Sequence, residues 1–337
     1  MTQLYTGETA DQVWRAAASE LRQSEAADLQ PGRGGATREQ LHAVFSISNP
    51  RQRWVVSRRP PINPAFAIAE VVWILNGRND AGFVNHWNPN LPKFAGEVDC
   101  YHGAYGFRLR KEFGFDQLER AYHALQNNPD SRQVVLQIWN PMSDFPDTGG
   151  VPVAADIPCN ICALPKLRNN KLEWLQVMRS NDLQRGLPYN FVQFTCLQEV
   201  MAGWLGVEVG TYSHVSDSLH TYERDIADVQ SFTQVEEEAN TDTLALSRSE
   251  SVEVLAEMSR LMDAIASPSL SQKDMRSLVS SHALPQGYRN MLLVTAADSA
   301  RRRDWPEITN ELMAECNNPA FVQTWNSWTM RRKEKSG

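Results

Sequence analysis

Segment 157–222 constrains the fold of this chain most, because polar motifs alternate there with apolar elements. Residues 191–204 (FVQFTCLQEVMAGW) are apolar on every side, which is typical of a helix buried at the centre of a domain. Ahead of them, residues 161–167 and 172–178 alternate in polarity around Asn169-Asn170 and predict a β-hairpin. We therefore expect a site built from strand ends and helix starts around this helix.

The rest of the core mixes helical and strand patterns. Residues 64–76 (PAFAIAEVVWILN) predict a buried helix that carries one carboxylate, Glu70. The other expected elements are helices at 8–24 and 115–127, strands at 41–47, 53–56, 133–139 and 206–215, a loop at 77–100 and a glycine-punctuated segment at 101–110. This mixture predicts an α/β (α+β) fold.

Beyond about residue 226 the sequence changes to acidic, Ser/Thr-rich segments with helical spacing, such as 252–264 and 305–315. These segments contain no motif that indicates chemistry. We therefore divide the chain into a catalytic core, residues 1–225, and a helical accessory layer, residues 226–337, packed on that core.

Charge and cysteine content exclude several classes of protein. The net charge of -7 and a pI near 5.6 argue against direct binding of nucleic acid, which requires a basic surface. The N-terminus has no secretory signal pattern, and no apolar run reaches the roughly 18 residues of a membrane span. We expect a cytoplasmic protein with no membrane partner. Its five cysteines are too sparse for a disulfide framework, so reduced thiols are expected.

Cys159 is the candidate nucleophile, at the end of an extended segment and just before the hairpin. A cysteine attacks as a thiolate, which requires positive charge nearby, and Arg33, Arg132 and Arg179 supply it if the fold gathers them. Cys162 completes a C-x-x-C pair, but no second Cys/His pair accompanies it. We therefore expect no metal site and assign Cys162 to packing.

Two candidate residues each have an alternative interpretation. Arg33 lies among three glycines in segment 31–37, so the segment either closes on an anion or forms a mobile surface loop. Glu70 lies amid apolar residues, so it is either paired or functional, or it sits at the helix edge and reaches solvent.

Segment 179–190 supplies polar groups for a ligand. Arg179 and Ser180 suit a phosphate, because a guanidinium binds two oxygens and a hydroxyl binds one more. Asp182 is expected to face another part of the pocket. Asn190 either caps the buried helix or binds a ring that offers one donor and one acceptor.

His220 and Tyr222 occupy positions i and i+2 of a strand-like segment and therefore point to one face. Together they suit a sugar hydroxyl. The alternative for His220 is a core histidine whose hydrogen bonds are satisfied internally.

Taken in order, these motifs resemble thymidylate synthase and its relatives, the pyrimidine-nucleotide hydroxymethylases. The resemblance covers roughly residues 5–225. It is carried by Glu70, GAYG at 103–106, DSR at 130–132, WN at 139–140, Pro158-Cys159, MRSND at 178–182, GLPYN at 186–190, and His220 with Tyr222.

The resemblance implies a large bent mixed sheet around the buried helix, in a homodimer that donates Arg132 across its interface. It implies that Cys159 adds to C6 of a pyrimidine, so that C5 attacks the one-carbon unit of 5,10-methylenetetrahydrofolate. Glu70 would move protons through water, and Tyr105 would assist removal of the C5 proton. The other implied roles are phosphate binding by Arg33, Arg132, Arg179 and Ser180, base binding by Asn190, sugar binding by His220 and Tyr222, and folate contact by Asp182 and Trp87.

Small departures from the synthase pattern bear on the reaction. Synthases usually carry histidine where this chain has Asn160, and a second arginine where it has Gln133. Ser218-Leu219 before His220 is similar to the hydroxymethylase branch, and the C-terminal WTMRRKEKSG differs from the apolar tail that closes the synthase site. Because water at the site favours a hydroxymethyl product, we expect hydroxymethylation, with Asn160 among the catalytic residues.

Asn190 bears on the choice of base. Its amide matches N3–H and O4 of uracil, whereas cytosine-specific relatives tend to carry Asp. We therefore expect conversion of dUMP to 5-hydroxymethyl-dUMP, which feeds modified DNA in some bacteriophages. The alternatives are a thymidylate synthase, a hydroxymethylase of dCMP or CMP, and an inactive homologue that binds nucleotide or RNA.

Overall fold

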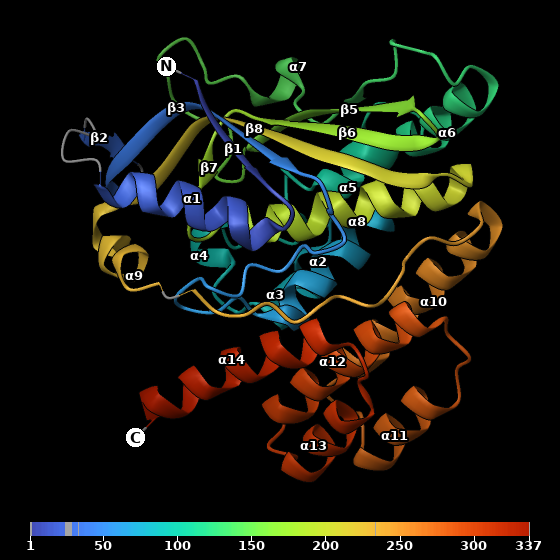
Figure 1. Ribbon diagram of the computed structural model, residues 1–337. Coiled ribbons are helices and arrows are strands. Elements are labelled where there is room, and N and C mark those ends of the chain that lie inside the picture. Colours follow the sequence, from blue (N-terminus) through green and yellow to red (C-terminus); the bar gives the residue numbers. More distant parts are fainter. Residues whose placement is uncertain (1, 24–28, 33, 233, 337) are drawn as a thin grey trace.

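The computed structural model describes residues 2–23, 29–32, 34–232 and 234–336. Within these ranges, eight strands form one mixed sheet (Figure 1). They are β1 (Gln3–Gly7), β2 (Leu29–Gly32), β3 (Gly35–Ile47), β4 (Leu136–Gln137), β5 (Asn160–Arg168), β6 (Lys171–Met178), β7 (Asn181–Asp182) and β8 (Glu208–Tyr222). Their order is β1-β3-β8-β6-β5-β4, with β2 paired to β3 and β7 paired to β8.

Helix α8 (Leu187–Leu205) lies against the inner face of this sheet and is buried along nearly its whole length. It ends at Gly206, whose φ of 65° suits a residue without Cβ. The other helices of the core are α1 (Ala10–Gln23), α2 (Pro64–Leu75), α3 (Ala81–Trp87), α4 (Pro92–Ala95), α5 (Tyr105–Phe107) with a π-helical turn (Arg108–Glu112), α6 (Gln117–Asn127), α7 (Pro141–Asp144) and α9 (Ile226–Gln230).

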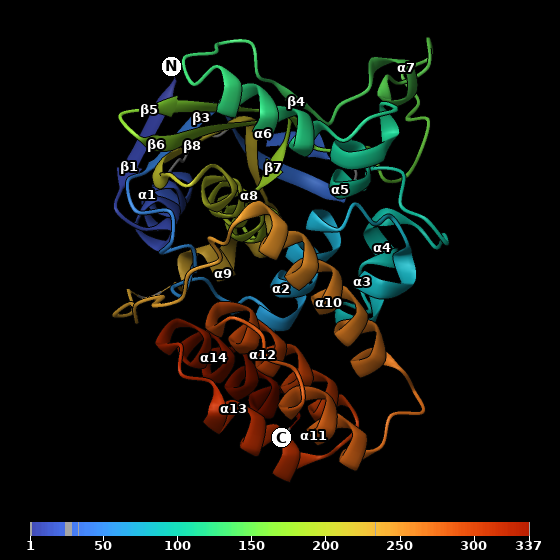
Figure 2. The ribbon, with the colours of Figure 1, turned by 90° about the vertical axis from the view of Figure 1, so that its right-hand side faces the viewer.

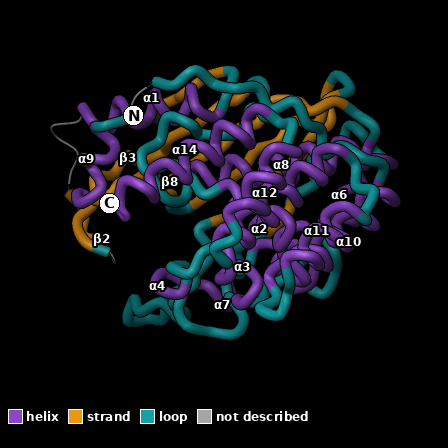
Figure 3. Tube along the Cα trace, turned by 90° about the horizontal axis from the view of Figure 1, so that it is seen from below, coloured by secondary structure: helices purple, strands orange, loops and turns teal. Residues whose placement is uncertain are grey.

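The C-terminal helices form a separate layer below the core (Figure 2). They are α10 (Arg248–Ala266), α11 (Gln272–Ser280), α12 (Gln286–Arg302), α13 (Pro306–Glu315) and α14 (Pro319–Ser336). Helices α10, α12 and α14 all contact α2, which is thereby held between this layer and α8. Viewed from below, α2, α8 and α12 lie across the strands (Figure 3).

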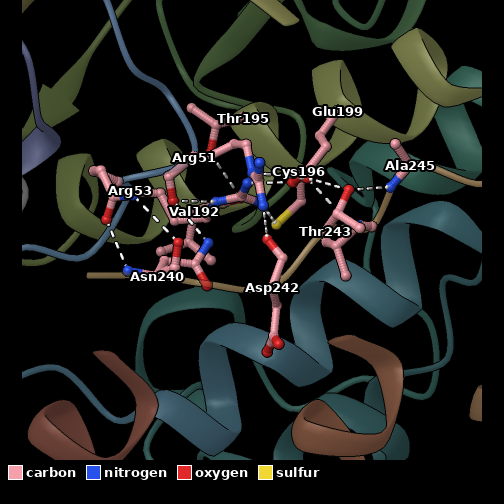
Figure 4. Close-up of polar contacts among 12 residues, drawn as sticks. Arg51, Arg53, Val192, Thr195, Cys196, Glu199, Asn240, Asp242, Thr243 and Ala245 are labelled. Atoms are coloured by element: carbon pink, nitrogen blue, oxygen red, sulfur yellow. Dashed lines mark hydrogen bonds and ion pairs between the residues drawn. The ribbon is translucent and has the colours of Figure 1, made fainter. Parts of the chain in front are cut away.

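A buried polar cluster joins α8 to the chain that leads into the C-terminal layer (Figure 4). Arg53 pairs with Glu199 and donates to Sγ of Cys196, both on α8. Oε1 of Glu199 also accepts from Oγ1 of Thr243 (3.2 Å) and from N of Leu244 (3.1 Å). Burial raises the pKa of Cys196, which therefore stays a thiol.

The expected α/β class, central buried helix and C-terminal helical layer are confirmed. The hairpin of β5 and β6 is also confirmed, and Asn169 and Asn170 form its turn with φ values of 51° and 59°. Such left-handed angles match the twist of paired strands, and asparagine tolerates them. The boundary between residues 225 and 226 stays a prediction.

Three local expectations are wrong. Residues 53–56 are buried but pair with no strand of the described chain, and the side chain of Arg53 is directed to α8. The expected loop at 77–100 contains α3 and α4, since packing of apolar residues such as Phe83 stabilises these short helices. The strand expected at 133–139 is reduced to β4. The glycine-punctuated segment at 101–110, by contrast, brings its backbone close to other segments as expected, because a Cβ on Gly106 would collide with the backbone of Ile74 and one on Gly103 would lie 2.9 Å from O of Asp156.

Candidate functional site

Cys159 immediately precedes β5, and Arg179 immediately follows β6, the two paired strands of the hairpin. N of Arg179 donates to the carbonyl of Cys159 (2.9 Å). Its guanidinium donates from Nε to O of Pro158 (3.0 Å) and from Nη2 to O of Ile157 (3.2 Å). The positive charge is thus fixed against the backbone that carries the candidate nucleophile, as Cys159 chemistry requires.

Tyr105, at the start of α5, lies close enough to three other candidates for their charges to act on its hydroxyl. Burial raises the pKa of Tyr105 well above its ordinary value. The charges of Cys159, Asp156 and Glu70 raise it further, whereas Arg179 opposes them. Tyr105, Cys159, Glu70 and Arg179 therefore share one electrostatic environment, although they come from four separate segments of the chain.

Glu70 is directed into the protein from α2. Its Oε2 is buried and has no hydrogen-bond partner among the described residues. Burial raises the pKa of this carboxyl to about 8, and a hydrogen bond from Gln193 opposes the shift. Glu70 as a whole is half-buried, so it lies at the edge of the buried face of α2 with its Oε2 turned inward. A carboxyl with such a pKa is suited to exchange protons near neutral pH.

Asn190 lies inside the first turn of α8 rather than at its N-cap. Gly186 occupies the cap position, and N of Asn190 donates to its carbonyl (2.9 Å), so the capping interpretation is wrong. The side chain is buried, and Nδ2 donates to Oδ1 of Asn181 (3.0 Å) and to Sδ of Met178 (3.3 Å).

A buried chain of polar groups behind Asn190 was not foreseen from the sequence. Nδ2 of Asn181 lies 3.0 Å from Nε2 of His214 and 3.2 Å from Oγ of Ser216. Nδ1 of His214 lies 2.9 Å from the hydroxyl of Tyr212. Burial lowers the pKa of His214 to about 3, so the ring is neutral. The alternation of β8 turns residues 212, 214 and 216 to the core, a register that the sequence did not reveal.

Asn160 is held by a second buried chain. Nε1 of Trp174 donates to Oε1 of Gln176 (3.0 Å), and Nε2 of Gln176 donates to Oδ1 of Asn160 (2.5 Å) and to O of Cys162 (2.9 Å). An indole N–H can only donate, so it fixes the orientation of the Gln176 amide. Nδ2 of Asn160 is left buried, and no described residue accepts from it. Asn160 pairs with Met178 in the sheet, so it lies near Asn190.

Asp182 accepts hydrogen bonds within its own turn. Oδ1 accepts from N of Gln184 (2.7 Å) and of Arg185 (2.8 Å), and Oδ2 accepts from Nη1 of Arg185 (3.3 Å). Through the pairing of β7 with β8, Asp182 lies opposite His220.

His220 and Tyr222 lie on one face of β8, with ring centroids 5.8 Å apart. Arg33 lies outside the described residues. Its neighbour Gly34 lies against Tyr222, because a Cβ on Gly34 would approach that ring to 3.0 Å. The guanidinium of Arg224, which the sequence did not single out, lies over the Tyr222 ring at 4.6 Å.

The remaining candidates within the described residues are Arg132, Ser180 and Trp87. Arg132 is exposed in the segment before β4, and Ser180 is half-buried between β6 and β7. Trp87 is fully buried in the core at the end of α3. Its carbonyl accepts from Nη2 of Arg302 in α12 (2.6 Å), so α3 is braced by the C-terminal layer.

The described ranges contain no cluster of histidine, cysteine or acidic side chains arranged to hold a metal ion. The same ranges include no helix long and apolar enough to cross a membrane. All five cysteines are described and are thiols, outside any disulfide.

Comparison with known proteins gives a consistent result. Residues 34–264 match the family model described as thymidylate synthase. A deoxyuridylate hydroxymethyltransferase of Bacillus phage SP01 is 38% identical over 206 residues, which are 58% of this chain and 53% of that protein. Another, of Pseudomonas phage M6, is 36% identical over 176 residues, 52% of this chain and 49% of that protein.

A thymidylate synthase of Bacillus atrophaeus is 30% identical over 168 residues, which are 48% of this chain and 71% of that protein. The chain thus spans about half the length of the two phage relatives it matches.

Proposed function

This chain belongs to the thymidylate synthase family, and we propose that it converts dUMP to 5-hydroxymethyl-dUMP with 5,10-methylenetetrahydrofolate as co-substrate. The observation that carries the proposal is the fixed placement of Arg179 beside Cys159, with Tyr105 and Glu70 in the same environment. The two phage relatives favour hydroxymethylation over methylation. The product would serve the synthesis of modified DNA.

The first step is attack by the Cys159 thiolate on C6 of the pyrimidine, which makes C5 nucleophilic. Arg179 favours the thiolate by its charge. The folate supplies the one-carbon unit that becomes bonded to C5. Tyr105 then assists removal of the C5 proton, the bond between the one-carbon unit and the folate nitrogen breaks, and tetrahydrofolate leaves an exocyclic methylene on C5. Water adds to the resulting exocyclic methylene carbon, its proton leaves, and the Cys159–C6 bond breaks to release the hydroxymethyl product.

Two buried polar atoms fit roles in these steps. Oε2 of Glu70 and Nδ2 of Asn160 both lack a protein partner within the described chain. Leaving such a group unpaired costs about 1–3 kcal/mol, so each is suited to a ligand or to water. Glu70, with a pKa of about 8, would exchange protons through water. Asn160 would donate to the oxygen of the attacking water.

Separate groups of residues would bind the phosphate, the sugar and the base of the nucleotide. Arg33, Arg179 and Ser180 would hold the 5′-phosphate, and His220 and Tyr222 would hold the 3′-hydroxyl. Asn190 would bind the uracil edge, and Asp182 would contact the folate. We do not propose Trp87 as a folate contact, because its side chain is fully buried.

We further propose a homodimer formed through the sheet face that lies opposite α8. Half-buried apolar side chains alternate with the core positions on this face: Leu164, Leu175, Val177 and Val215. The ribbon shows the long helices beneath the sheet, not above these strands (Figure 1). Arg132 is exposed and would reach the phosphate site of the partner. Residues 226–337 would serve as an accessory layer that braces α2 and α3.

The test is to incubate the protein with dUMP and methylenetetrahydrofolate and to identify the nucleotide by mass spectrometry. We expect a hydroxymethyl product with tetrahydrofolate returned, and no product from Cys159→Ala. A methyl product with dihydrofolate would instead indicate a thymidylate synthase, the second candidate, which the Bacillus atrophaeus match favours. Parallel incubations with dCMP, UMP and CMP test the choice of base and sugar. Equal product from Cys159→Ala and wild type would exclude the covalent mechanism.

A further inference from the structure

Asn190 is the last member of a buried relay of polar side chains that runs back through the sheet. The Asn190 relay consists of Asn190, Asn181, His214 and Tyr212, linked at 3.0, 3.0 and 2.9 Å. All four are buried, three of them at or below 2% exposure and Asn190 at 6%. Phe45 and Phe191 enclose the His214 ring at centroid distances of 6.0 and 5.7 Å. Water therefore has little access to the inner end of the relay.

Met178 determines which way the two amides point. Its Sδ lies 3.3 Å from Nδ2 of Asn190 and 3.5 Å from Nδ2 of Asn181. A thioether sulfur accepts hydrogen bonds weakly and cannot donate one. Reversing either amide would place a carbonyl oxygen against this sulfur and would lose a favourable contact. Both amide nitrogens are therefore held on the Met178 side.

The orientation of Asn181 in turn fixes the tautomer of His214. A neutral imidazole carries one proton, and Nε2 must accept because it faces Nδ2 of Asn181. The proton is thus on Nδ1 and is donated to the hydroxyl oxygen of Tyr212. Oγ of Ser216 is a third acceptor around Nδ2 of Asn181, after Nε2 of His214 and Sδ of Met178, and shares the two N–H groups with them. Every link of the relay then runs in one direction, and Oδ1 of Asn181 is left to accept from Asn190.

We propose that Asn181, His214 and Tyr212 are positioning residues that hold the Asn190 amide in the orientation that selects uracil over cytosine. The inference rests on the proposed function, since it concerns the base that Asn190 would bind there. With Nδ2 directed to Asn181, Oδ1 of Asn190 accepts from N3–H of uracil. The second N–H of the amide stays directed to Sδ of Met178, so discrimination between the bases rests on the acceptor that Oδ1 offers to N3.

Cytosine requires the opposite arrangement, because its N3 accepts and its exocyclic amino group donates. Reversing the Asn190 amide would bring its Oδ1 against Oδ1 of Asn181, two acceptors with no proton between them. To avoid this, Asn181 and the His214 tautomer must also reverse, against the preference of the Met178 sulfur. The relay thus makes rejection of cytosine a property of four buried residues rather than of one amide.

The experiment compares kcat/KM for dUMP and dCMP, and equilibrium binding of each nucleotide, in the full-length protein. The variants are His214→Leu, which removes the acceptor, and His214→Gln, whose side-chain oxygen can still accept from Asn181. We expect His214→Leu to lower the ratio of kcat/KM for dUMP to kcat/KM for dCMP by about tenfold, which corresponds to one hydrogen bond of roughly 1.4 kcal/mol. His214→Gln should keep most of the wild-type ratio. General loss of structure would lower kcat/KM for both substrates together and leave their ratio unchanged.

His86→Leu is the matched control, because His86 is also neutral through burial but lies outside the relay, on α3. Its ratio should equal that of the wild type. If His214→Leu fails to fold, Met178→Leu and Tyr212→Phe provide the test, because the first removes the shared sulfur and the second removes the inner acceptor. An unchanged ratio in the folded relay variants, with dUMP turnover retained, overturns the inference alone. A wild-type protein that neither binds nor converts dUMP overturns the proposed function, and the inference with it.

Discussion

Arg53 and Glu199 form an ion pair in which both side chains are almost completely buried, at 3% and 1% exposure. The pair connects the segment before α2 to α8, and Glu199 extends it to Leu244 of the chain that enters the C-terminal layer. The carboxylate of Glu199 therefore links α8 to the segment before α2 and to the chain that enters the C-terminal layer. Removing Arg53 leaves Glu199 with Arg51, whose Nε lies 3.4 Å from Oε1 of Glu199 and whose side chain is 37% exposed, so the buried charge is then only partly compensated.

We predict that Arg53→Ala lowers the free energy of unfolding by about 3 kcal/mol, the lower end of the usual cost of breaking a buried pair, because Arg51 still faces Glu199. Urea denaturation measures it. Arg276→Ala is the control, because its pair with Glu311 has side chains 45% and 52% exposed. Exposed pairs add little stability, so the midpoint of this control should match the wild type. Equal midpoints for Arg53→Ala and Arg276→Ala would contradict the prediction.

The raised pKa of Glu70 predicts how stability depends on pH. The folded carboxyl has a pKa of about 8 against an ordinary value of 4.5, so the folded state binds this proton more tightly than the unfolded state. The stability contributed by the protonated carboxyl is fully present below about pH 4.5. It is lost as pH rises towards 8.

Glu70→Gln keeps the shape of the side chain and has no proton to lose. We therefore expect its free energy of unfolding, relative to wild type, to increase steadily between about pH 4.5 and 8. Denaturation curves of both proteins across this range give the difference. A constant difference would mean that Glu70 is ionised in the folded protein at neutral pH. Turnover by Glu70→Gln should fall at every pH, since amide cannot exchange the proton.

The elements that the sequence predicted well are those whose polarity pattern is set by burial on one or all sides. Helix α8 is apolar all round and lies at the centre, and the β5–β6 hairpin alternates around two asparagines. The short helices α3 and α4 could not be predicted, because their few residues have little helical tendency of their own and depend on packing.

The same distinction holds at the site. Cys159 precedes the first strand of the predicted hairpin and Arg179 follows the second. Pairing of the two strands brings them together, so their contact follows from the sequence. Asn181 and His214 are 33 residues apart on strands that are not joined by a hairpin. Their contact depends on the inward side of β8, whose register the sequence did not reveal.

The turn of the β5–β6 hairpin gives a prediction that is independent of function. Asn169 has a φ of 51°, a region that costs residues other than glycine and asparagine roughly 1–2 kcal/mol. We expect Asn169→Val to lower the free energy of unfolding by about that amount. Asn170→Gly, at a φ of 59°, should keep or increase stability, because Asn-Gly suits this turn best. A stable Asn169→Val variant would show that the turn has another conformation.

Gln176 offers the sharpest test of the role proposed for Asn160. Gln176→Leu leaves Nε1 of Trp174 and Oδ1 of Asn160 without their partners, which costs about 1–3 kcal/mol for each group. It also frees the Asn160 amide to turn, so that Nδ2 no longer faces the attacking water. We expect lower turnover of dUMP and a smaller share of hydroxymethyl product among the products found by mass spectrometry.

Gln198→Leu is the matched control for this loss. Gln198 is equally buried, and its Nε2 donates to the carbonyls of Leu172 (2.8 Å) and Gly210 (3.1 Å). Leu172 is near the start of β6, whereas Asn160 pairs with Met178 at the end of that strand. Both substitutions therefore remove one buried amide from the same core and should lower the unfolding midpoint similarly. Only Gln176→Leu should change the product, because only Gln176 contacts Asn160. If both variants lose activity in proportion to stability, with the product unchanged, Asn160 has a structural role and does not direct water.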